Sequence, residues 1–348
     1  MTRTSLDAHQ RAPHASVRLP AATVFPPALR GELFGPQGWS ELTEVVDVLA
    51  ECPDGHSLLA HPRRTEVEVL VTSWGAPRLT AEVLDELPRL HTVVHAAGSV
   101  RKLVSDAVWQ RGIVVVSAAD ANNEPVAEYV YAQTVLALKD VHRRSRRITE
   151  QRALPPLEAV PGLDGSSVGL VSLGSVARKV AHRLHRINVE VRGWDPYQGE
   201  AIFRTAGVRK VADLRELFAR SLVLSVHTPL LPGRTEKLIT GDLLRRLPVG
   251  ATFVNTARGA VVDEEALITV LVERPDLFAV LDVTVDEPPV PESPLYSLPN
   301  VMLTGHVAGT VGAERRAMGR LVTAELRRIA AGVDPEHVVT AELAPLLA

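Results

Sequence analysis

The chain has 348 residues, of which 46% are hydrophobic and 23% are charged, a balance typical of globular proteins rather than disordered or fibrous ones. Its 38 Lys and Arg residues against 41 Asp and Glu residues leave a net charge of −3, so the sequence does not favour a nucleic-acid partner. The single cysteine, Cys52, excludes an intramolecular disulfide and any multi-cysteine metal site, and we predict no metal.

Residues 1–20 show neither helical nor strand periodicity and are predicted to form a flexible leader. They lack the apolar segment of a signal peptide, and no apolar run in the sequence has the length that a membrane span needs. We therefore expect a cytoplasmic protein without a membrane partner. The length favours two domains.

In residues 1–121, short apolar runs alternate with helix-like segments, which is typical of parallel βα units and predicts a smaller α/β domain. The predicted strands cover residues 67–71, 91–94 and 113–116, and the predicted helices cover residues 80–87 and 105–110.

Residues 124–148 are predicted to form one long helix between the domains. Its apolar side chains lie on or near one face and are Val126, Val130, Tyr131, Val135, Leu136 and Leu138. Residues 139–147 are strongly basic, so this half is expected to be solvated or paired. The apolar face is either a dimer surface or part of the core, and the sequence leaves both open.

A second βα series follows and predicts a doubly wound parallel sheet over residues 122–308. Its predicted strands cover residues 167–171, 189–194, 222–226, 252–255, 278–283 and 301–303. Its predicted helices cover residues 177–187, 213–219, 242–247 and 264–271. Residues 309–348 contain a last helix, over 313–331, that is expected to return to the first domain.

A nucleotide-binding turn is predicted where the strand 167–171 runs into the next helix. Ser172, Gly174 and Ala177 occupy the positions of a G-x-G-x-x-G/A motif, at which backbone N–H groups and a helix N-terminus receive a pyrophosphate. Gly174, Ser175 and Val176 are therefore candidate cofactor-binding residues. Ser172 replaces the first glycine of the motif.

Asp195 follows Gly174 by 21 residues, at the end of the next predicted strand. A carboxylate at this place accepts hydrogen bonds from the adenosine ribose and repels a 2′-phosphate. The pattern therefore favours NAD over NADP. The alternative is a plain strand–turn–helix unit with a surface aspartate.

Three polar residues follow the last three predicted strands, where ligands bind in α/β sheets. Arg258 offers a guanidinium, which binds a planar carboxylate such as that of a 2-oxo acid. Glu287 and His306 offer a carboxylate–imidazole pair, which can donate a proton to a carbonyl oxygen. Taken one at a time, each also fits a surface loop or a satisfied core position.

In these residues the chain resembles the D-isomer-specific 2-hydroxyacid dehydrogenase family, from about Val93 to Thr310. The matching motifs are His227-Thr228-Pro229-Leu230, the run Asn255-Thr256-Ala257-Arg258-Gly259-Ala260-Val261-Val262-Asp263-Glu264-Glu265-Ala266-Leu267, Asp282-Val283 with Glu287-Pro288, Thr304-x-His306, and Asn123-Glu124-Pro125-Val126-Ala127-Glu128. The resemblance implies a Rossmann NAD-binding domain, a flavodoxin-like substrate domain, and a homodimer.

The resemblance also implies roles for single residues. Arg258 would bind the substrate carboxylate, His306 would be the general acid or base with Glu287 as its partner, and Asp282 would bind the nicotinamide carboxamide. The other implied cofactor-lining residues are His227, Thr228, Pro229, Thr256 and Ala257. Gly98, Ser99 and Val100 would offer backbone N–H groups to the substrate carboxylate, which would lie between the domains.

The chain departs from the family at two further places. Gly305 stands where the family has a proline before the histidine, and Arg101-Lys102 follow the substrate loop where the family often has Asp-Asn. These two cations either bind a second anionic group of the substrate or point into solvent. Trp74 either walls the same pocket or packs under the loop.

The sequence therefore predicts an NAD-dependent enzyme that reduces a 2-oxo acid to a D-2-hydroxy acid, or catalyses the reverse reaction. The alternative is an NAD(H)-sensing regulatory protein on the same scaffold, like the transcriptional corepressors of this family. Turnover of a 2-oxo acid distinguishes the two.

Overall fold

The computed structural model describes residues 18–157 and 160–347. The predicted leader therefore lies largely outside the described residues, and its last residues, Leu19 and Pro20, begin the first strand. The chain divides into two units. The first contains residues 18–96, 103–116 and 319–338, and the second contains residues 97–102, 117–318 and 339–347, with 158–159 left out.

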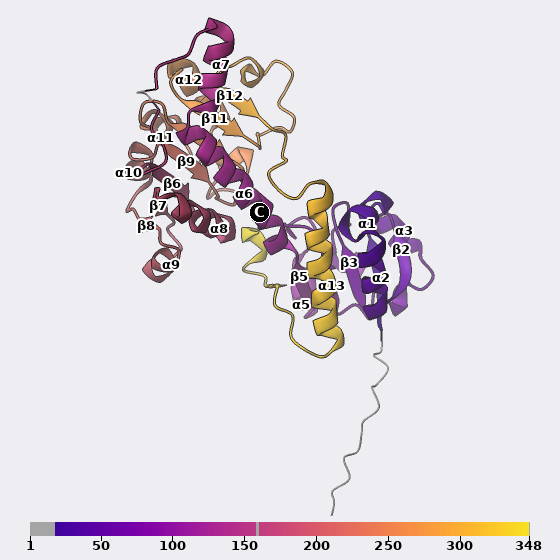
Figure 1. The fold of residues 1–348 in the computed structure, drawn as a ribbon. Helices are drawn as coiled ribbons and strands as arrows, with labels where there is room; N and C mark the ends of the chain where they lie inside the picture. Colours follow the sequence, from indigo (N-terminus) through magenta and orange to yellow (C-terminus); the bar gives the residue numbers. More distant parts are fainter. Residues whose placement is uncertain (1–17, 158–159, 348) are drawn as a thin grey trace, which may run out of the picture. The chain divides into compact units, whose positions relative to one another are not determined.

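A six-stranded sheet forms the first unit's core, in the order β13-β5-β4-β3-β1-β2. Its strands β5, β3 and β2 are labelled in Figure 1. Its strands are β1 Leu19–Val24, β2 Val46–Cys52, β3 Val69–Thr72, β4 Thr92–His95, β5 Val114–Ser117 and β13 Val338–Val339. The accompanying helices are α1 Pro27–Leu33, α2 Gly35–Val45, α3 Gly55–Ala60, α4 Ala81–Asp85, α5 Asp106–Gln110 and α13 Arg316–Ala330. The order β2-β1-β3-β4-β5 is that of flavodoxin-like sheets, which confirms the predicted fold of this part.

A seven-stranded sheet forms the core of the second unit, in the order β12-β11-β10-β9-β6-β7-β8, and every neighbouring pair is parallel. Its strands are β6 Ser167–Val171, β7 Glu190–Trp194, β8 Arg209–Lys210, β9 Val223–Val226, β10 Thr252–Asn255, β11 Phe278–Leu281 and β12 Val301–Leu303. Its helices are α6 Ala119–Leu138, α7 Val141–Gln151, α8 Ser175–Leu184, α9 Glu200–Thr205, α10 Leu214–Ala219, α11 Gly241–Arg245 and α12 Glu264–Glu273. This is the predicted doubly wound sheet.

The single long helix predicted over 124–148 is wrong. Two helices, α6 and α7, replace it, and α6 begins earlier, at Ala119. They are separated at Asp140, whose backbone is left-handed with φ 53°. Its carboxylate accepts a hydrogen bond from Nε of Arg143 at 2.5 Å, and Arg143 in turn is held by the end of the sheet. The break therefore depends on tertiary contacts that a helical period does not contain.

The apolar residues of α6 contribute to the core of the second unit. Val130 and Leu138 are almost completely buried, together with Ala127 and Ala137 of the same helix. This burial favours the core interpretation for these side chains. The homodimer stays a prediction.

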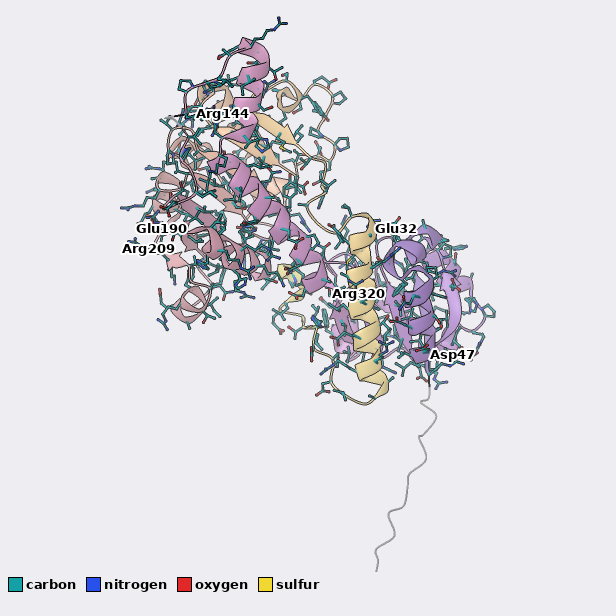
Figure 2. The ribbon with its side chains drawn as sticks, in the orientation of Figure 1. Glu32, Asp47, Arg144, Glu190, Arg209 and Arg320 are labelled. Atoms are coloured by element: carbon teal, nitrogen blue, oxygen red, sulfur yellow. The ribbon has the colours of Figure 1, made fainter. Side chains whose placement is uncertain are left out.

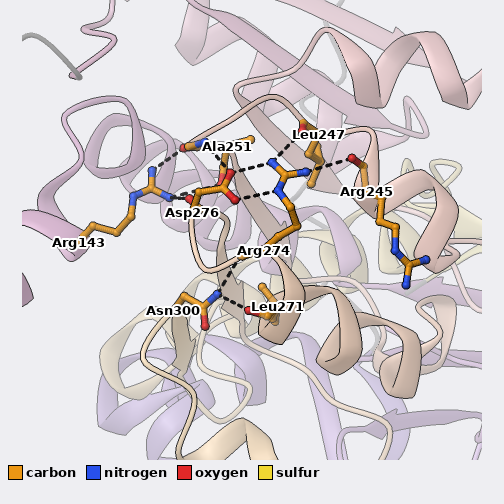
Figure 3. Close-up of polar contacts among 9 residues, drawn as sticks. Arg143, Arg245, Leu247, Ala251, Leu271, Arg274, Asp276 and Asn300 are labelled. Atoms are coloured by element: carbon orange, nitrogen blue, oxygen red, sulfur yellow. Dashed lines mark hydrogen bonds and ion pairs between the residues drawn. The ribbon is translucent and has the colours of Figure 1, made fainter.

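Polar side chains close the amino-terminal ends of β10, β11 and β12 (Figure 3). Arg143 donates to the carbonyl oxygens of Gly250, at 2.5 Å, and Asp276, at 3.0 Å. Arg274 donates to both carboxylate oxygens of Asp276, at 2.8 and 2.7 Å, and Asn300 donates to the Leu271 carbonyl at 2.9 Å. These bonds tie α7 and α12 to one end of the sheet, which leaves its carboxyl end for other groups.

The exposed edge strand β8 forms an ion pair with its neighbour β7. Arg209 lies 3.4 Å from Glu190 of β7 (Figure 2), and charged side chains on an edge discourage pairing with another chain. Neither β8 nor α9 was predicted, and β8 has only 2 residues. None of the helices over the described residues combines the length and apolar character that crossing a bilayer requires.

Candidate active site

The predicted reacting groups of the second unit follow neighbouring parallel strands at their carboxyl ends. Arg258 follows β10, Asp282 directly follows β11, and His306 follows β12. His227 directly follows β9 in the same way. Because the strands are parallel, these residues are brought to one edge of the sheet.

Glu287 and His306 form a direct pair. Oε2 of Glu287 lies 2.7 Å from Nδ1 of His306, and both side chains are 40% or more exposed. The carboxylate therefore holds one ring nitrogen and leaves Nε2 for a reacting group. This is the geometry of a general acid and base with an orienting partner.

The backbone conformation explains why a glycine, and not a proline, precedes His306. Gly305 and His306 are both left-handed, with φ 69° and 62°, and a proline cannot adopt a positive φ. The N–H of His306 donates to the carbonyl oxygen of Asp282 at 2.6 Å, which fixes the turn onto β11. Gly305 therefore fits the conformation of this turn, and the catalytic role of His306 stays a prediction.

Arg258 is held next to this pair by its own loop. Nη1 donates to the Ala257 carbonyl at 2.5 Å, and the amide of Asn255 donates to the Arg258 carbonyl at 3.1 Å. A Cβ on Gly259 would lie 2.0 Å from the backbone carbon of Thr284, so only glycine permits this close approach. Burial lowers the pKa of Arg258, whereas the charge of Glu287 opposes this change.

The predicted substrate loop is fixed by backbone-directed bonds. The Ser117 hydroxyl contacts the carbonyl oxygens of Ala97 and Gly98 at 3.1 and 2.8 Å. The Ser99 hydroxyl donates to the Leu347 carbonyl at 3.1 Å, and Val100 is completely buried.

Arg101 and Lys102 differ in the structure. Arg101 is partly buried and its Nη1 donates to the Leu230 carbonyl at 2.5 Å, and its charge further lowers the pKa of Arg258. Lys102 is exposed. Trp74 belongs to the first unit, so its predicted place at the substrate pocket stays a prediction.

The predicted nucleotide turn lies between β6 and α8. Gly174 caps α8, and a Cβ built there would meet nothing within 4 Å. The space next to the turn is therefore open, and the N–H groups of the first helical turn, from Ser175 and Val176, have no acceptor within the helix. Ser172 is left-handed with φ 70°, and its hydroxyl lies 2.8 Å from that of Thr228.

Asp195 is buried at the end of β7 and shapes this turn. Its Oδ2 accepts the N–H of Leu173 at 2.8 Å, and Oδ1 accepts those of Tyr197 and Gln198 at 2.8 and 3.2 Å. A carboxylate has about four acceptor positions, so capacity remains for a further donor. The predicted ribose contact stays a prediction.

Two buried atoms at the carboxyl ends of β9 and β10 have no hydrogen-bond partner within the described part of the chain: Nε2 of His227 and Oγ1 of Thr256. Burial lowers the pKa of His227 to about 3, so its ring is neutral. Buried polar atoms are normally paired, and the hydroxyl and phosphate groups of a dinucleotide would supply the partners. The residues present therefore fit such a cofactor. The neighbouring Pro229 carbonyl accepts the Thr235 hydroxyl at 2.6 Å, which fixes the loop.

Asp282 is almost completely buried and accepts several hydrogen bonds. Oδ1 accepts the Thr304 hydroxyl at 2.6 Å and the Val307 N–H at 2.8 Å, and Oδ2 accepts the Ala308 N–H at 3.0 Å. Tyr129 of α6 lies 3.0 Å from the Thr304 hydroxyl. Tyr129 was not predicted as a site residue.

A cluster with metal-ligand chemistry lies in the first unit, away from these residues in the sequence. Glu325, Glu336 and His337 place one possible ligand atom each within 4.8 Å of one another. However, Glu325 is paired with His337, and Glu336 lies 2.8 Å from Nη1 of Arg328. Bonds within the protein account for this arrangement.

Comparison with known families gives one match that covers half of the chain. Residues 131–308 match the family described as "D-isomer specific 2-hydroxyacid dehydrogenase, NAD binding domain". The match includes the nucleotide turn, Arg258, Glu287 and His306.

Curated proteins and solved structures agree with this match. The chain is 32% identical to D-3-phosphoglycerate dehydrogenase of Mycobacterium tuberculosis over 88% of this chain and 57% of that protein. It is 31% identical to (S)-sulfolactate dehydrogenase of Chromohalobacter salexigens, over 72% of this chain and 81% of that protein. The structure of an NADPH-dependent glyoxylate/hydroxypyruvate reductase from Sinorhizobium meliloti is 26% identical, with a TM-score of 0.72 over 94% of this chain and 99% of that one. The chain spans about half the length of the phosphoglycerate dehydrogenases that it matches.

Proposed function

Because the chain belongs to the D-isomer-specific 2-hydroxyacid dehydrogenase family, we propose that it transfers hydride between a nicotinamide dinucleotide and a small 2-oxo or D-2-hydroxy acid. The observation that carries this proposal is the Glu287–His306 pair, with 2.7 Å between its atoms, near the charge of Arg258. An acid–base pair next to a guanidinium suits a substrate that has a carbonyl adjacent to a carboxylate.

In the direction of reduction, Arg258 binds the carboxylate and orients the carbonyl group of the 2-oxo acid. A reduced nicotinamide held at this end of the sheet would supply the hydride that adds to the carbonyl carbon. His306 donates a proton to the carbonyl oxygen through Nε2, while Glu287 holds Nδ1 and stabilises the charged ring. In the direction of oxidation, His306 accepts the proton from the hydroxyl group.

The cofactor in this proposal is NAD rather than NADP. Asp195 stands at the end of β7 and next to the nucleotide turn, where its buried negative charge opposes a 2′-phosphate. Asp195→Asn keeps one acceptor oxygen for the backbone N–H groups and removes the charge. We expect this variant to show a lower preference for NADH over NADPH, measured as the ratio of the two kcat/KM values. An unchanged ratio would contradict the assigned role.

The proposed substrate has a second anionic group. The charge of the Arg101 guanidinium lowers the pKa of Arg258, and the carboxylate of Glu287 is already paired with His306. A singly charged 2-oxo acid neutralises one of these cations, whereas a phosphonate, phosphate, sulfonate or second carboxylate neutralises the other. Relatives that are named for phosphoglycerate and sulfolactate act on acids of this kind.

The test is the oxidation of NADH, followed by its absorbance, with a panel of singly and doubly anionic 2-oxo acids. Turnover that is highest with a doubly anionic acid supports the proposal. Arg101→Gln is expected to raise KM about 10-fold or more for that acid and to change KM little for a singly charged one, since a charge-assisted hydrogen bond contributes about 1.5–3 kcal/mol.

Lys102→Gln is the matched control, because it removes the same charge from the adjacent, exposed position. Equal effects of the two variants would show that only the general charge matters and would contradict the second subsite. No turnover with any acid, while NADH still binds, would contradict the proposed activity.

We also propose that the protein acts as a cytoplasmic homodimer, as the family resemblance implies. The buried apolar residues of α6 do not test this assembly, since they pack within the second unit. Light scattering of the purified chain measures its mass in solution, and a monomeric mass would contradict the dimer.

A further inference from the structure

A row of hydrogen-bonded side chains leads from Asp282 away from the reacting groups. The Thr304 hydroxyl contacts Asp282 at 2.6 Å, and Tyr129 contacts Thr304 at 3.0 Å. Gln133 lies one turn further along α6 and is hydrogen-bonded to Tyr129. Oε1 of Gln133 lies 3.0 Å from Nε2 of His142, at the start of α7. The row therefore connects a buried carboxylate near the site with two successive helices.

The chemistry of the groups fixes the direction of every hydrogen bond in the row. The backbone N–H groups at Asp282 are directed to an acceptor, so Thr304 is the donor to Asp282 and its oxygen must accept from Tyr129. The Tyr129 oxygen then accepts from the Gln133 amide, whose carbonyl oxygen accepts from Nε2 of His142. Burial and the charge of Arg143 lower the pKa of His142, which favours a neutral ring that carries its proton on Nε2.

The phenol is suited to be a permanent donor. Burial, followed by the charge of Asp282, raises the pKa of Tyr129, so its hydroxyl keeps the proton at any physiological pH. The donors to Asp282 from Val307 and Ala308 come from one backbone segment. Only the Thr304 hydroxyl is rotatable, so its direction depends on the bond from Tyr129.

We propose that Tyr129 is a positioning residue for the cofactor: through Thr304, it holds the Asp282 carboxylate in the orientation that receives the nicotinamide carboxamide. The inference rests on the proposed function, since it assumes a nicotinamide dinucleotide at this edge of the sheet. Without the phenol hydroxyl, Thr304 can rotate toward another acceptor, and the carboxylate is then held only by the N–H groups of Val307 and Ala308. The chain thus uses α6, far from residue 282 in sequence, to set the angle of the nicotinamide ring.

The test compares Tyr129→Phe with Tyr131→Phe, which removes the same hydroxyl from a half-buried position two residues further along α6. The first readout is the Kd of NADH, measured by its fluorescence in the absence of substrate. We expect Tyr129→Phe to raise this Kd about 3–10-fold, the range that corresponds to one lost hydrogen bond. Tyr131→Phe is expected to leave the Kd within about twofold of the wild-type value.

The second readout is the fidelity of hydride transfer, followed with NADH that carries deuterium on one or the other face of the ring. Tyr129→Phe is expected to transfer a measurable fraction from the wrong face, which a general loss of stability does not produce. Thr304→Val breaks the row at the next position, so adding Tyr129→Phe to Thr304→Val is expected to have little further effect on Kd.

A wild-type Kd in Tyr129→Phe, or a double variant whose effects simply add, would overturn the positioning role. If the wild-type protein binds NADH but reduces no 2-oxo acid, the proposed activity fails, while the comparison of Kd values still decides the role of Tyr129. If Tyr131→Phe weakens binding as strongly as Tyr129→Phe, the effect belongs to α6 as a whole and the row is not its cause.

Discussion

The two ends of the seven-stranded sheet differ in whether certain polar side chains have a hydrogen-bond partner. At the amino ends, Arg143, Arg274 and Asn300 donate to carbonyl or carboxylate oxygens of neighbouring segments, so each has a partner within the protein. At the carboxyl ends, Nε2 of His227 and Oγ1 of Thr256 are buried without a partner among the described residues.

From this difference we expect the amino ends to contribute mainly to stability and the carboxyl ends to bind a ligand. A polar group that is satisfied internally contributes to folding, whereas one that is buried without a partner costs free energy until a ligand supplies the bond. Glu287 and His306 lie between these cases, since they are paired with each other and are still exposed. The comparison predicts that substitutions at the two ends have separable effects.

The largest expected effect is on catalysis at the carboxyl end. His306→Ala should reduce kcat by about 10²–10⁴-fold, the usual contribution of a general acid or base. Because the side chain is exposed, the midpoint of thermal unfolding should hardly change, and the Kd of NADH should stay within about twofold. A loss of NADH binding instead would show that His306 contacts the cofactor rather than the reacting oxygen.

The second prediction concerns the amino end. Asp276→Asn should lower the free energy of unfolding by about 1–2 kcal/mol, because it removes half of the bidentate bond with Arg274 and its charge. The Kd of NADH should not change. Denaturant titration measures the loss, and Asp242→Asn, in an ion pair whose aspartate is almost fully exposed, is the control and should have little effect. Weaker NADH binding in Asp276→Asn would break the distinction between the two ends.

A third prediction concerns how the buried His227 makes the stability of the protein depend on pH. The folded state holds the pKa of His227 at about 3, below its ordinary value of 6.5, so the unfolded chain binds a proton more readily between these values. The free energy of unfolding should therefore fall as the pH is lowered below 6.5, by roughly 2 kcal/mol between pH 7 and pH 5.

Denaturant titrations at pH 5, 6 and 7 measure this contribution. His227→Asn removes the titrating ring, so its stability should depend less steeply on pH than that of the wild type. His142, whose pKa is also lowered by burial, contributes in the same direction in both proteins and cancels in the comparison. Parallel pH profiles would show that His227 is not the group responsible.

The smallest expected effect is at the nucleotide turn. Ser172→Gly relieves a left-handed serine but removes the hydroxyl contact with Thr228, and these two changes oppose each other. The free energy of unfolding should stay within about 1 kcal/mol of the wild-type value. Thermal unfolding and NADH titration check both properties. A large loss of stability would show that the hydroxyl pair, rather than the backbone conformation, holds the turn together.

Sequence analysis was most successful for the second sheet. β6, β10 and β12 have the predicted bounds. β6 and β10 are buried almost throughout, and parallel strands that are buried on both faces form short continuous apolar runs between turn residues. It was least successful at the beginning of the chain, where β1 and β2 were not predicted. β2 contains Asp47 and Glu51 and is only partly buried at the edge of its sheet, so its apolar signal is weak.

The candidate site shows the same limit. The residue types and their order after successive strands were sufficient to indicate Arg258, Glu287 and His306 as a group. Tyr129 was missed, although a visible signal existed: Tyr129 and Gln133 are polar residues spaced by four on a helix with an otherwise apolar face. That spacing indicates a shared partner but does not identify it.

The sequence by itself determined the alternation of strands and helices, the turn between β6 and α8, and the residues that follow the strand ends, because these depend on local patterns. The tertiary structure decided which buried polar groups have a hydrogen-bond partner among the described residues and which do not. It also decided that Arg101 contacts Leu230 and that Tyr129 contacts Thr304, bonds between residues more than a hundred positions apart. The physical reason is that a hydrogen bond depends on distance and direction in space, which chain folding sets and residue spacing alone does not contain.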